Sequence, residues 1–218
     1  MMPTDSFAAA YAFSFSMAIG AVLSPGPVTT AIISQSPRLG WVTGPLVSVG
    51  HALLELLMVL LITIGLSGIL GAPIAQTIIA IMGGLLLLWM GGGMFIGALR
   101  GRMRLPEKGS ADEKIGYSRM LSMGVLASLS NPFWYAWWMT AAAVYILQAK
   151  AAGWVPVAGF YLGHVSADFA WNTILSTVVG GGKKLMTNRI YAVLIGICSL
   201  FLVYLAVKFL IAGFNGIA

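Results

Sequence analysis

The sequence predicts an all-α membrane protein in which six transmembrane helices form two inverted repeats of three helices each. Composition gives the first indication: 59% of the 218 residues are hydrophobic and only 8% are charged, with a mean hydropathy of +0.94. A soluble domain carries about 25% charged residues, so this chain has too few charges to solvate a globular surface. At about 20 apolar residues per crossing, its length leaves room for six helices and short loops.

Six apolar runs, each long enough to cross a bilayer, give the second indication. They lack the apolar–polar alternation of barrel strands, so we expect helices. The runs are Phe7–Ser34, Trp41–Leu70, Pro73–Leu99, Met120–Leu147, Val155–Val179 and Ile190–Ile211. This division predicts one integral membrane domain, with a first repeat at residues 1–99, a basic loop at 100–119 and a second repeat at 120–218.

The loop between the third and fourth runs, Arg100–Arg119, is rich in basic residues and sets the expected orientation. If this loop is cytoplasmic, ten of the twelve Lys and Arg residues lie on the cytoplasmic side, and only Lys150 and Lys208 lie opposite. The positive-inside rule then predicts a multi-pass protein of the cell membrane with both termini outside. Positive charge of this kind reports orientation, so we expect no nucleic-acid partner. A lipid-headgroup or regulatory site in the loop is the alternative.

A short motif occurs once in each half of the chain and gives the third indication. The second run contains GHALLE at residues 50–55 and the fifth contains GHVSAD at residues 163–168, so both read Gly-His, three residues, acid. Helix-breaking sequences match as well, with SPGP at 24–27 in the first run and SNP at 130–132 in the fourth. Because each repeat has an odd number of helices, three, the second copy enters the membrane from the side opposite to the first. This architecture favours alternating access.

Glu55 and Asp168 are the only carboxylates within the apolar runs. A charge at such depth costs about 2.5–3.5 kcal/mol on insertion scales. His51 and His164 each precede their acid by four residues, which places histidine and acid on one helix face. We expect these four side chains, together with Asn172, to line a central site that binds protons, a cation or the cationic part of a substrate. The alternative is that each histidine only bonds its own acid and holds helices together.

The proline-containing sequences predict interrupted helices. Ser24, Pro25, Gly26 and Pro27 should break the first span and Asn131–Pro132 the fourth, because proline lacks an amide proton and clashes with the preceding turn. Broken helices expose backbone groups and helix dipoles that can hold a carboxylate or an ammonium group. An ordinary proline kink is the simpler interpretation at each position.

An aromatic cluster, FWYAWW at residues 133–138, follows the second break. It is compatible with an interfacial belt, with lipid-facing packing or with one wall of the site.

Taken together, these features resemble the lysine-exporter (LysE/RhtB) family of amino-acid efflux proteins. The resemblance rests on the Ser24–Pro27 break, Arg38–Gly40 after it, Asn131–Pro132, the six runs and the basic central loop. Phe133 follows Pro132, where the familiar amino-acid exporters usually carry lysine. The resemblance implies export of amino acids or related small metabolites across the cytoplasmic membrane, energised by the proton gradient or membrane potential, by a homodimer.

The sequence therefore predicts a secondary active exporter and not an enzyme, with a small-molecule substrate, a coupling proton and membrane lipids as partners and no cofactor. One alternative is a divalent metal-cation exporter, with His51, Glu55, His164 and Asp168 as ligands of the transported ion. A further alternative is an intramembrane metal-dependent enzyme. Neither His-Glu-x-x-His nor Gly-x-Ser-x-Gly occurs in the chain.

Overall fold

A computed structural model describes residues 5–23, 26–65, 72–102, 116–181 and 187–215. Within these ranges the chain consists of helices and their connections, with no β-strand. In the first half these are α1 (Phe7–Val22), α2 (Pro27–Leu39), the 3₁₀ turn η1 (Gly40–Val42), α3 (Thr43–Thr63) and α5 (Pro73–Leu99). In the second half they are α6 (Tyr117–Leu129), α7 (Pro132–Trp137), the π-helical turn η2 (Trp138–Ala142), α8 (Ala143–Ala152), α9 (Trp154–Gly181) and α10 (Asn188–Asn215).

Both expected helix breaks are present. The first apolar run divides into α1 and α2, and Gly26 precedes α2 in an extended conformation (φ −158°, ψ −175°). The fourth run divides at Ser130 and Asn131 into α6 and α7. In both cases proline is the first residue of the new helix, where its missing amide proton and fixed φ are tolerated. Ser24 and Pro25 lie outside the described residues.

Three helical stretches of the described chain are long and apolar enough to cross a membrane: Pro27–Thr63, which comprises α2, η1 and α3, Pro73–Leu99 and Asn188–Asn215. Phe7–Val22 is a shorter apolar helix. The fold is therefore an all-α bundle with membrane-spanning character. The full set of six spans in two inverted repeats stays a prediction.

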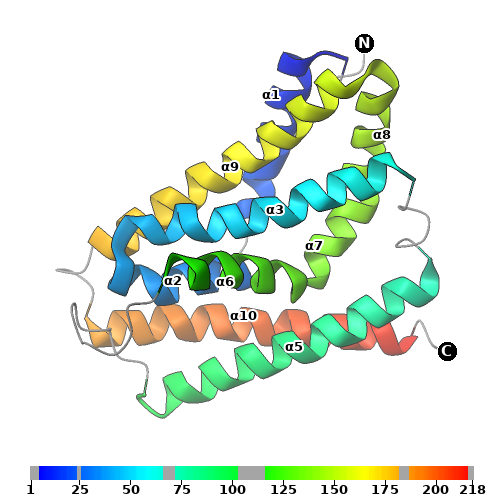
Figure 1. The fold of residues 1–218 in the computed structure, drawn as a ribbon. Coiled ribbons are helices and arrows are strands. Elements are labelled where there is room, and N and C mark those ends of the chain that lie inside the picture. The colour runs from blue at the N-terminus through cyan, green and yellow to red at the C-terminus, as the bar shows by residue number, and fades with distance from the viewer. Residues whose placement is uncertain (1–4, 24–25, 66–71, 103–115, 182–186, 216–218) are drawn as a thin grey trace.

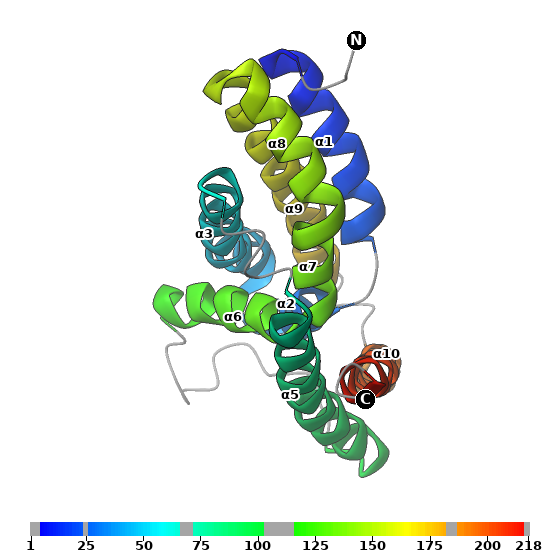
Figure 2. The ribbon, with the colours of Figure 1, turned by 90° about the vertical axis from the view of Figure 1, so that its right-hand side faces the viewer.

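The helices pack in a pattern that brings the two halves of the chain together. Helix α1 lies against α9, α3 lies against both α6 and α9, and α5 pairs with α10 at one side of the molecule (Figures 1 and 2). Helices α3 and α9 run in opposite directions (Figure 1). A buried apolar cluster that includes Ile62, Trp138 and Phe160 fills the space between α3, α9 and the α7–α8 segment.

Glycine permits the closest of these helix contacts. A Cβ on Gly50 of α3 would clash with the main-chain carbonyl of Leu121 in α6, and one on Gly124 of α6 would clash with the carbonyl of Val47. In the other half, a Cβ on Gly163 of α9 would clash with the backbone of Tyr11 in α1. These three positions allow backbones to approach as membrane helices commonly do at small residues.

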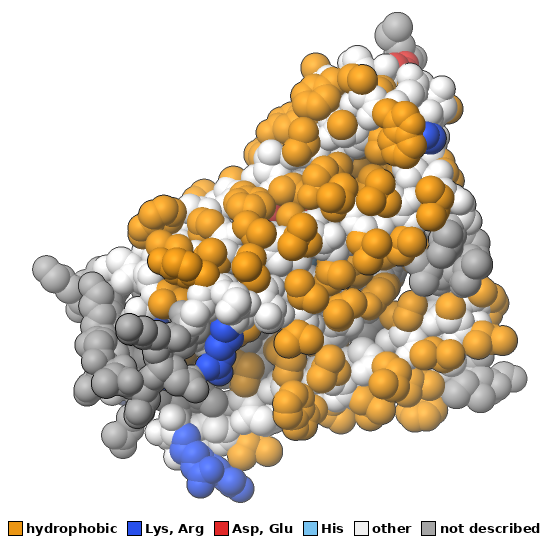
Figure 3. Space-filling view, viewed as in Figure 1, with side chains coloured by type: hydrophobic (Ala, Val, Ile, Leu, Met, Phe, Trp, Pro, Cys, Tyr) orange, Lys and Arg blue, Asp and Glu red, His pale blue; other side chains and the backbone are white. Residues whose placement is uncertain are grey.

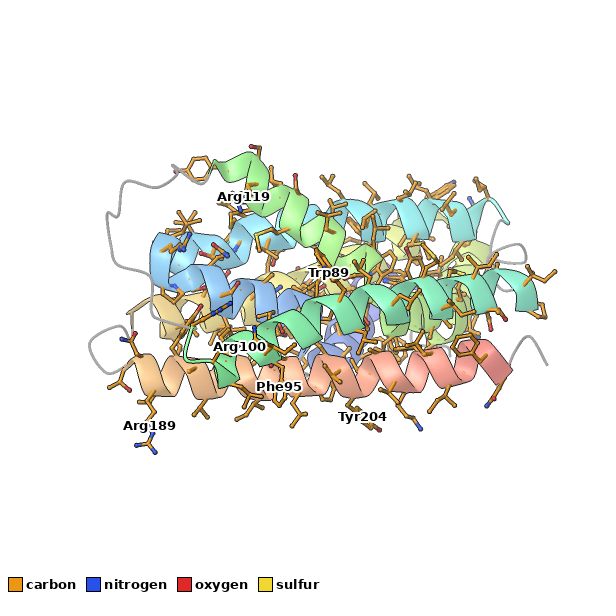
Figure 4. All side chains as sticks on the ribbon, turned by 90° about the horizontal axis from the view of Figure 1, so that it is seen from below. Trp89, Phe95, Arg100, Arg119, Arg189 and Tyr204 are labelled. Carbon is orange, nitrogen blue, oxygen red and sulfur yellow. The ribbon has the colours of Figure 1, made fainter. Side chains whose placement is uncertain are left out.

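The surface is apolar along the helices and basic at one end. Hydrophobic side chains cover the visible face, and most of its Lys and Arg surface lies at one end (Figure 3). Arg100, Arg119 and Arg189 lie towards that end of the long helices (Figure 4). Helix α1 begins and α10 ends at the opposite end (Figure 1).

Candidate functional site

The two His–acid motifs meet between α3 and α9. Helix α3 supplies His51 and Glu55, and the antiparallel helix α9 supplies His164 and Asp168. All four side chains are buried, and Glu55 is completely so. The convergence expected from the sequence is therefore present, and the four groups form one cluster of ionisable side chains.

Glu55 occupies the centre of this cluster. Its Oε1 lies 3.1 Å from Nε2 of His51 and 3.4 Å from Nε2 of His164. Asp168 is more loosely placed, with one carboxylate oxygen 4.0 Å from Nε2 of His51 and the other 4.0 Å from Nε2 of His164. A carboxylate this deeply buried is costly unless it is paired, and the two histidines supply that pairing for Glu55.

A polar seam continues from the cluster along α3 and α9. The Asn172 side chain donates a hydrogen bond to Ser48 Oγ (2.9 Å), and Ser176 Oγ donates to the main-chain carbonyl of Trp41 (2.7 Å). Both bonds lie on the side of the cluster nearest the start of α3, next to the basic end. Asn172, which the sequence placed in the site, thus lines the cavity and also bonds α3 to α9.

Ser128, a residue that the sequence did not single out, contacts the cluster from α6. Its hydroxyl shares a hydrogen bond with Nδ1 of His51 and lies 2.7 Å from the carbonyl of Gly124, to which it donates. Nδ1 of His164, by contrast, is buried without a hydrogen-bond partner among the described residues. Serine is common in helices, and only the packing of α6 on α3 makes this one distinctive.

A cavity of about 90 Å³ lies beside the cluster, between the two helix breaks. No lysine or arginine of the described residues lines it. Its wall combines the four ionisable groups with residues from both breaks and from α7: Ala21, Val22, Gly26, Pro27, Val28, Thr29, His51, Glu55, Asn131, Phe133, Trp134, Trp137, His164, Asp168 and Asn172.

The two breaks present different helix N-termini to this cavity. Among the described residues, no side chain caps the first turn of α2, which begins at Pro27 after Gly26. At the other break, Asn131 caps α7 by accepting a hydrogen bond from the Phe133 amide (3.1 Å). Uncapped amides and the positive end of a helix dipole attract anions, so the α2 terminus is the better anion-binding element.

The aromatic cluster after Pro132 forms one wall of the site, which decides among the interpretations that the sequence left open. Trp134 and Trp137 line the cavity. Trp137 stacks on His164 with ring centroids 6.0 Å apart, and Trp138 lies tilted at 5.2 Å from the same imidazole. The spacing of 134, 137 and 138 along a helix was the sequence signal that could have indicated a shared face.

A comparison with protein families gives the affiliation of the chain. A family model described as LysE type translocator matches residues 19–213. The chain belongs to the LysE type translocator family. The comparisons with curated proteins and with solved structures find no match.

The family match covers the site described above. The matched segment extends from α1 into α10 and contains both His–acid motifs and both helix breaks. A LysE type translocator moves a small-molecule substrate through a membrane, and the apolar helices of this chain fit that environment.

Proposed function

We propose that this LysE type translocator is a secondary active exporter of amino acids or related small metabolites across the cytoplasmic membrane. The observation that carries the proposal is the convergence of His51, Glu55, His164 and Asp168 on a small cavity at the breaks of two helices. Ionisable groups at membrane depth are expensive and mark ion or proton pathways. Discontinuous helices are where secondary transporters bind substrates and coupling ions.

In this proposal, Glu55 carries the coupling proton. It lies at the centre of the cluster, lines the cavity and contacts both histidines. Protonation from outside and release inside would drive efflux, and the membrane potential could contribute. The substrate carboxylate would bind the uncapped first turn of α2, and its ammonium group would face Asp168 across the cavity.

Alternating access follows from an inverted repeat, which the packing supports. Gly50 and Gly163 open the two His–acid motifs, and each touches the first half of the broken span in the other half of the chain. Gly50 lies against Leu121 of α6, and Gly163 lies against Tyr11 of α1. Such reciprocal contacts are those that a two-fold axis in the membrane plane would create.

The position of the charged residues supports the proposed orientation. Arg100, Arg119 and Arg189 gather at one end of the long helices (Figure 4). By the positive-inside rule this end is cytoplasmic, and α1 begins and α10 ends on the outer side. The Ser48–Asn172 and Ser176–Trp41 hydrogen bonds then close the inner side of the site.

A second candidate function is export of a divalent metal cation. It is favoured by one observation: ligand atoms of His51, Glu55 and Asp168 lie within 4.8 Å of one another. Imidazole and carboxylate ligands suit borderline metals such as zinc, manganese or nickel. In this case the carboxylates act as ionised ligands, and the same residues bind the transported ion itself.

Thermal stabilisation of the purified protein distinguishes the two candidates. The protein is titrated with the twenty common L-amino acids and, separately, with zinc, manganese and nickel, in wild type and Glu55→Gln. Amino-acid export predicts stabilisation by one or more amino acids that persists in Glu55→Gln. A chelator-reversible metal response that Glu55→Gln weakens about tenfold or more, without an amino-acid response, would replace the first proposal by the second.

A further inference from the structure

Ser128 links the second helix break to the first His–acid motif. It lies in the last turn of α6, three residues before Asn131, and its side chain is fully buried. The hydroxyl bonds to Nδ1 of His51 and to the carbonyl of Gly124. Ser128 does not line the cavity, so it cannot act on a substrate directly.

Counting protons decides the direction of these hydrogen bonds. A serine hydroxyl has one proton to donate and can accept through its oxygen. The carbonyl of Gly124 can only accept, and at 2.7 Å it takes the hydroxyl proton. The bond to His51 must therefore run the other way, from an Nδ1–H group to the Ser128 oxygen.

We propose that Ser128 is a positioning residue, which holds a proton on Nδ1 of His51 and so turns Nε2 towards Glu55. There Nε2 accepts the carboxyl proton of protonated Glu55 or, in the imidazolium form, donates to the ionised carboxylate. Ser128 orients the 3.1 Å contact between His51 and Glu55. The effect of this contact on transport rests on the proposed function. A histidine is commonly fixed in one tautomer by the bond that its other nitrogen makes. The same bond ties the end of α6 to α3 at the level of the site.

The second motif has no counterpart of the Ser128–His51 hydrogen bond in the described part of the chain. Nδ1 of His164 has no partner in the described part of the chain. Gly50 contacts Leu121, and Ser128 follows Leu121 by seven residues. Gly163 contacts Tyr11, and Ala18 follows Tyr11 by seven residues. Alanine offers no hydroxyl, so the matching position of α1 cannot fix His164 as Ser128 fixes His51.

Nitrogen NMR of the imidazoles tests the proposal directly. The chain contains only two histidines, so full-length protein labelled with ¹⁵N-histidine in lipid nanodiscs gives two sets of signals, assigned with His51→Asn. We expect the proton of His51 on Nδ1 in wild type and in Ser128→Thr, which keeps the hydroxyl. In Ser128→Ala the Nε2–H tautomer should appear.

Ser130→Ala is the matched control. Ser130 is also fully buried at the end of α6 and donates to a main-chain carbonyl, that of Ala127 at 2.9 Å, whereas Nδ1 of His51 bonds to Ser128. Its substitution should leave both histidine signals unchanged. If the His51 signals of Ser128→Ala match those of wild type, or if wild type carries the proton on Nε2 alone, the proposal is wrong.

Transport supplies the second readout. Loss of a hydrogen bond to a charged or ionisable group, worth about 1.5 kcal/mol, corresponds to about a tenfold lower rate. We expect this decrease in amino-acid efflux for Ser128→Ala, recovery in Ser128→Thr and no change in Ser130→Ala. If wild type transports no amino acid, the proposed function fails while the NMR result still decides the role of Ser128. Equal efflux in wild type and Ser128→Ala would contradict the positioning role.

Discussion

In the first half of the chain His51 and Glu55 approach within 3.1 Å, whereas His164 and Asp168, the corresponding residues of the second half, are 4.0 Å apart. His51 is tied to Ser128, while Nδ1 of His164 is unpartnered within the described residues and its ring lies against Trp137 and Trp138. Nearly identical motifs have thus acquired different surroundings. The first motif therefore holds its histidine and acid in close contact, and the second holds them further apart.

The difference between the acids has a simple chemical cause. Glutamate is one methylene longer than aspartate, and the Glu55 carboxylate reaches both imidazoles, at 3.1 and 3.4 Å. Asp168 stays at 4.0 Å from each. We therefore assign proton coupling to Glu55 and substrate contact to Asp168 in the proposed exporter.

The largest effect should come from neutralising each acid in turn. In proteoliposomes loaded with amino acids under an inward proton gradient, Glu55→Gln should reduce efflux at least about a hundredfold, since breaking a buried ion pair costs about 3–5 kcal/mol. Asp168→Asn should reduce it about tenfold, because its contacts are longer. Equal losses in the two variants would remove the functional distinction between the motifs.

Substituting the glycine of each motif should have an intermediate effect on stability, and here we expect the two halves of the chain to respond alike. Gly50→Ala and Gly163→Ala each place a methyl group against a neighbouring backbone, so each should destabilise the protein by about 1–3 kcal/mol. Gly92→Ala in α5 is the control, since nothing lies within 4 Å of its Cβ position. Thermal unfolding in detergent provides the measurement. A large loss for only one of the two motif glycines would argue against reciprocal packing of the halves.

The smallest effect should follow from making the motifs more alike. Ala18→Ser adds a hydroxyl at the α1 position that matches Ser128, where it could accept a hydrogen bond from His164. We expect a change in unfolding free energy within about 1 kcal/mol, the net value of one hydrogen bond, and a shift of the His164 ¹⁵N signals towards those of His51. Unchanged His164 signals would show that the two positions are not equivalent.

Much of the site follows from local sequence. A histidine and an acid four residues apart share a helix face in any helix, and a proline after a short polar sequence starts a new helix at Pro27 and at Pro132. The repetition of both signals was sufficient to predict that the two motifs lie together. The family affiliation agrees with the resemblance seen in the sequence.

Other features depend on tertiary packing that no local pattern encodes. Ser128 meets His51 across 77 residues of sequence, and only the register of α6 on α3 brings them together. The stacking of Trp137 on His164 likewise needs α7 to lie beside α9. The central position of Glu55 depends on side-chain length as well as on helix position, so the similar motifs gave no sign of it.

In the proposed exporter, substrate efflux is coupled to proton entry through Glu55. The most direct test of this coupling imposes an outward amino-acid gradient on proteoliposomes at equal pH and follows the lumen with an entrapped pH dye. Wild type should acidify the lumen as the amino acid leaves, and Glu55→Gln, with binding retained, should not. Efflux by wild type without acidification, or equal acidification by Glu55→Gln, would contradict the account.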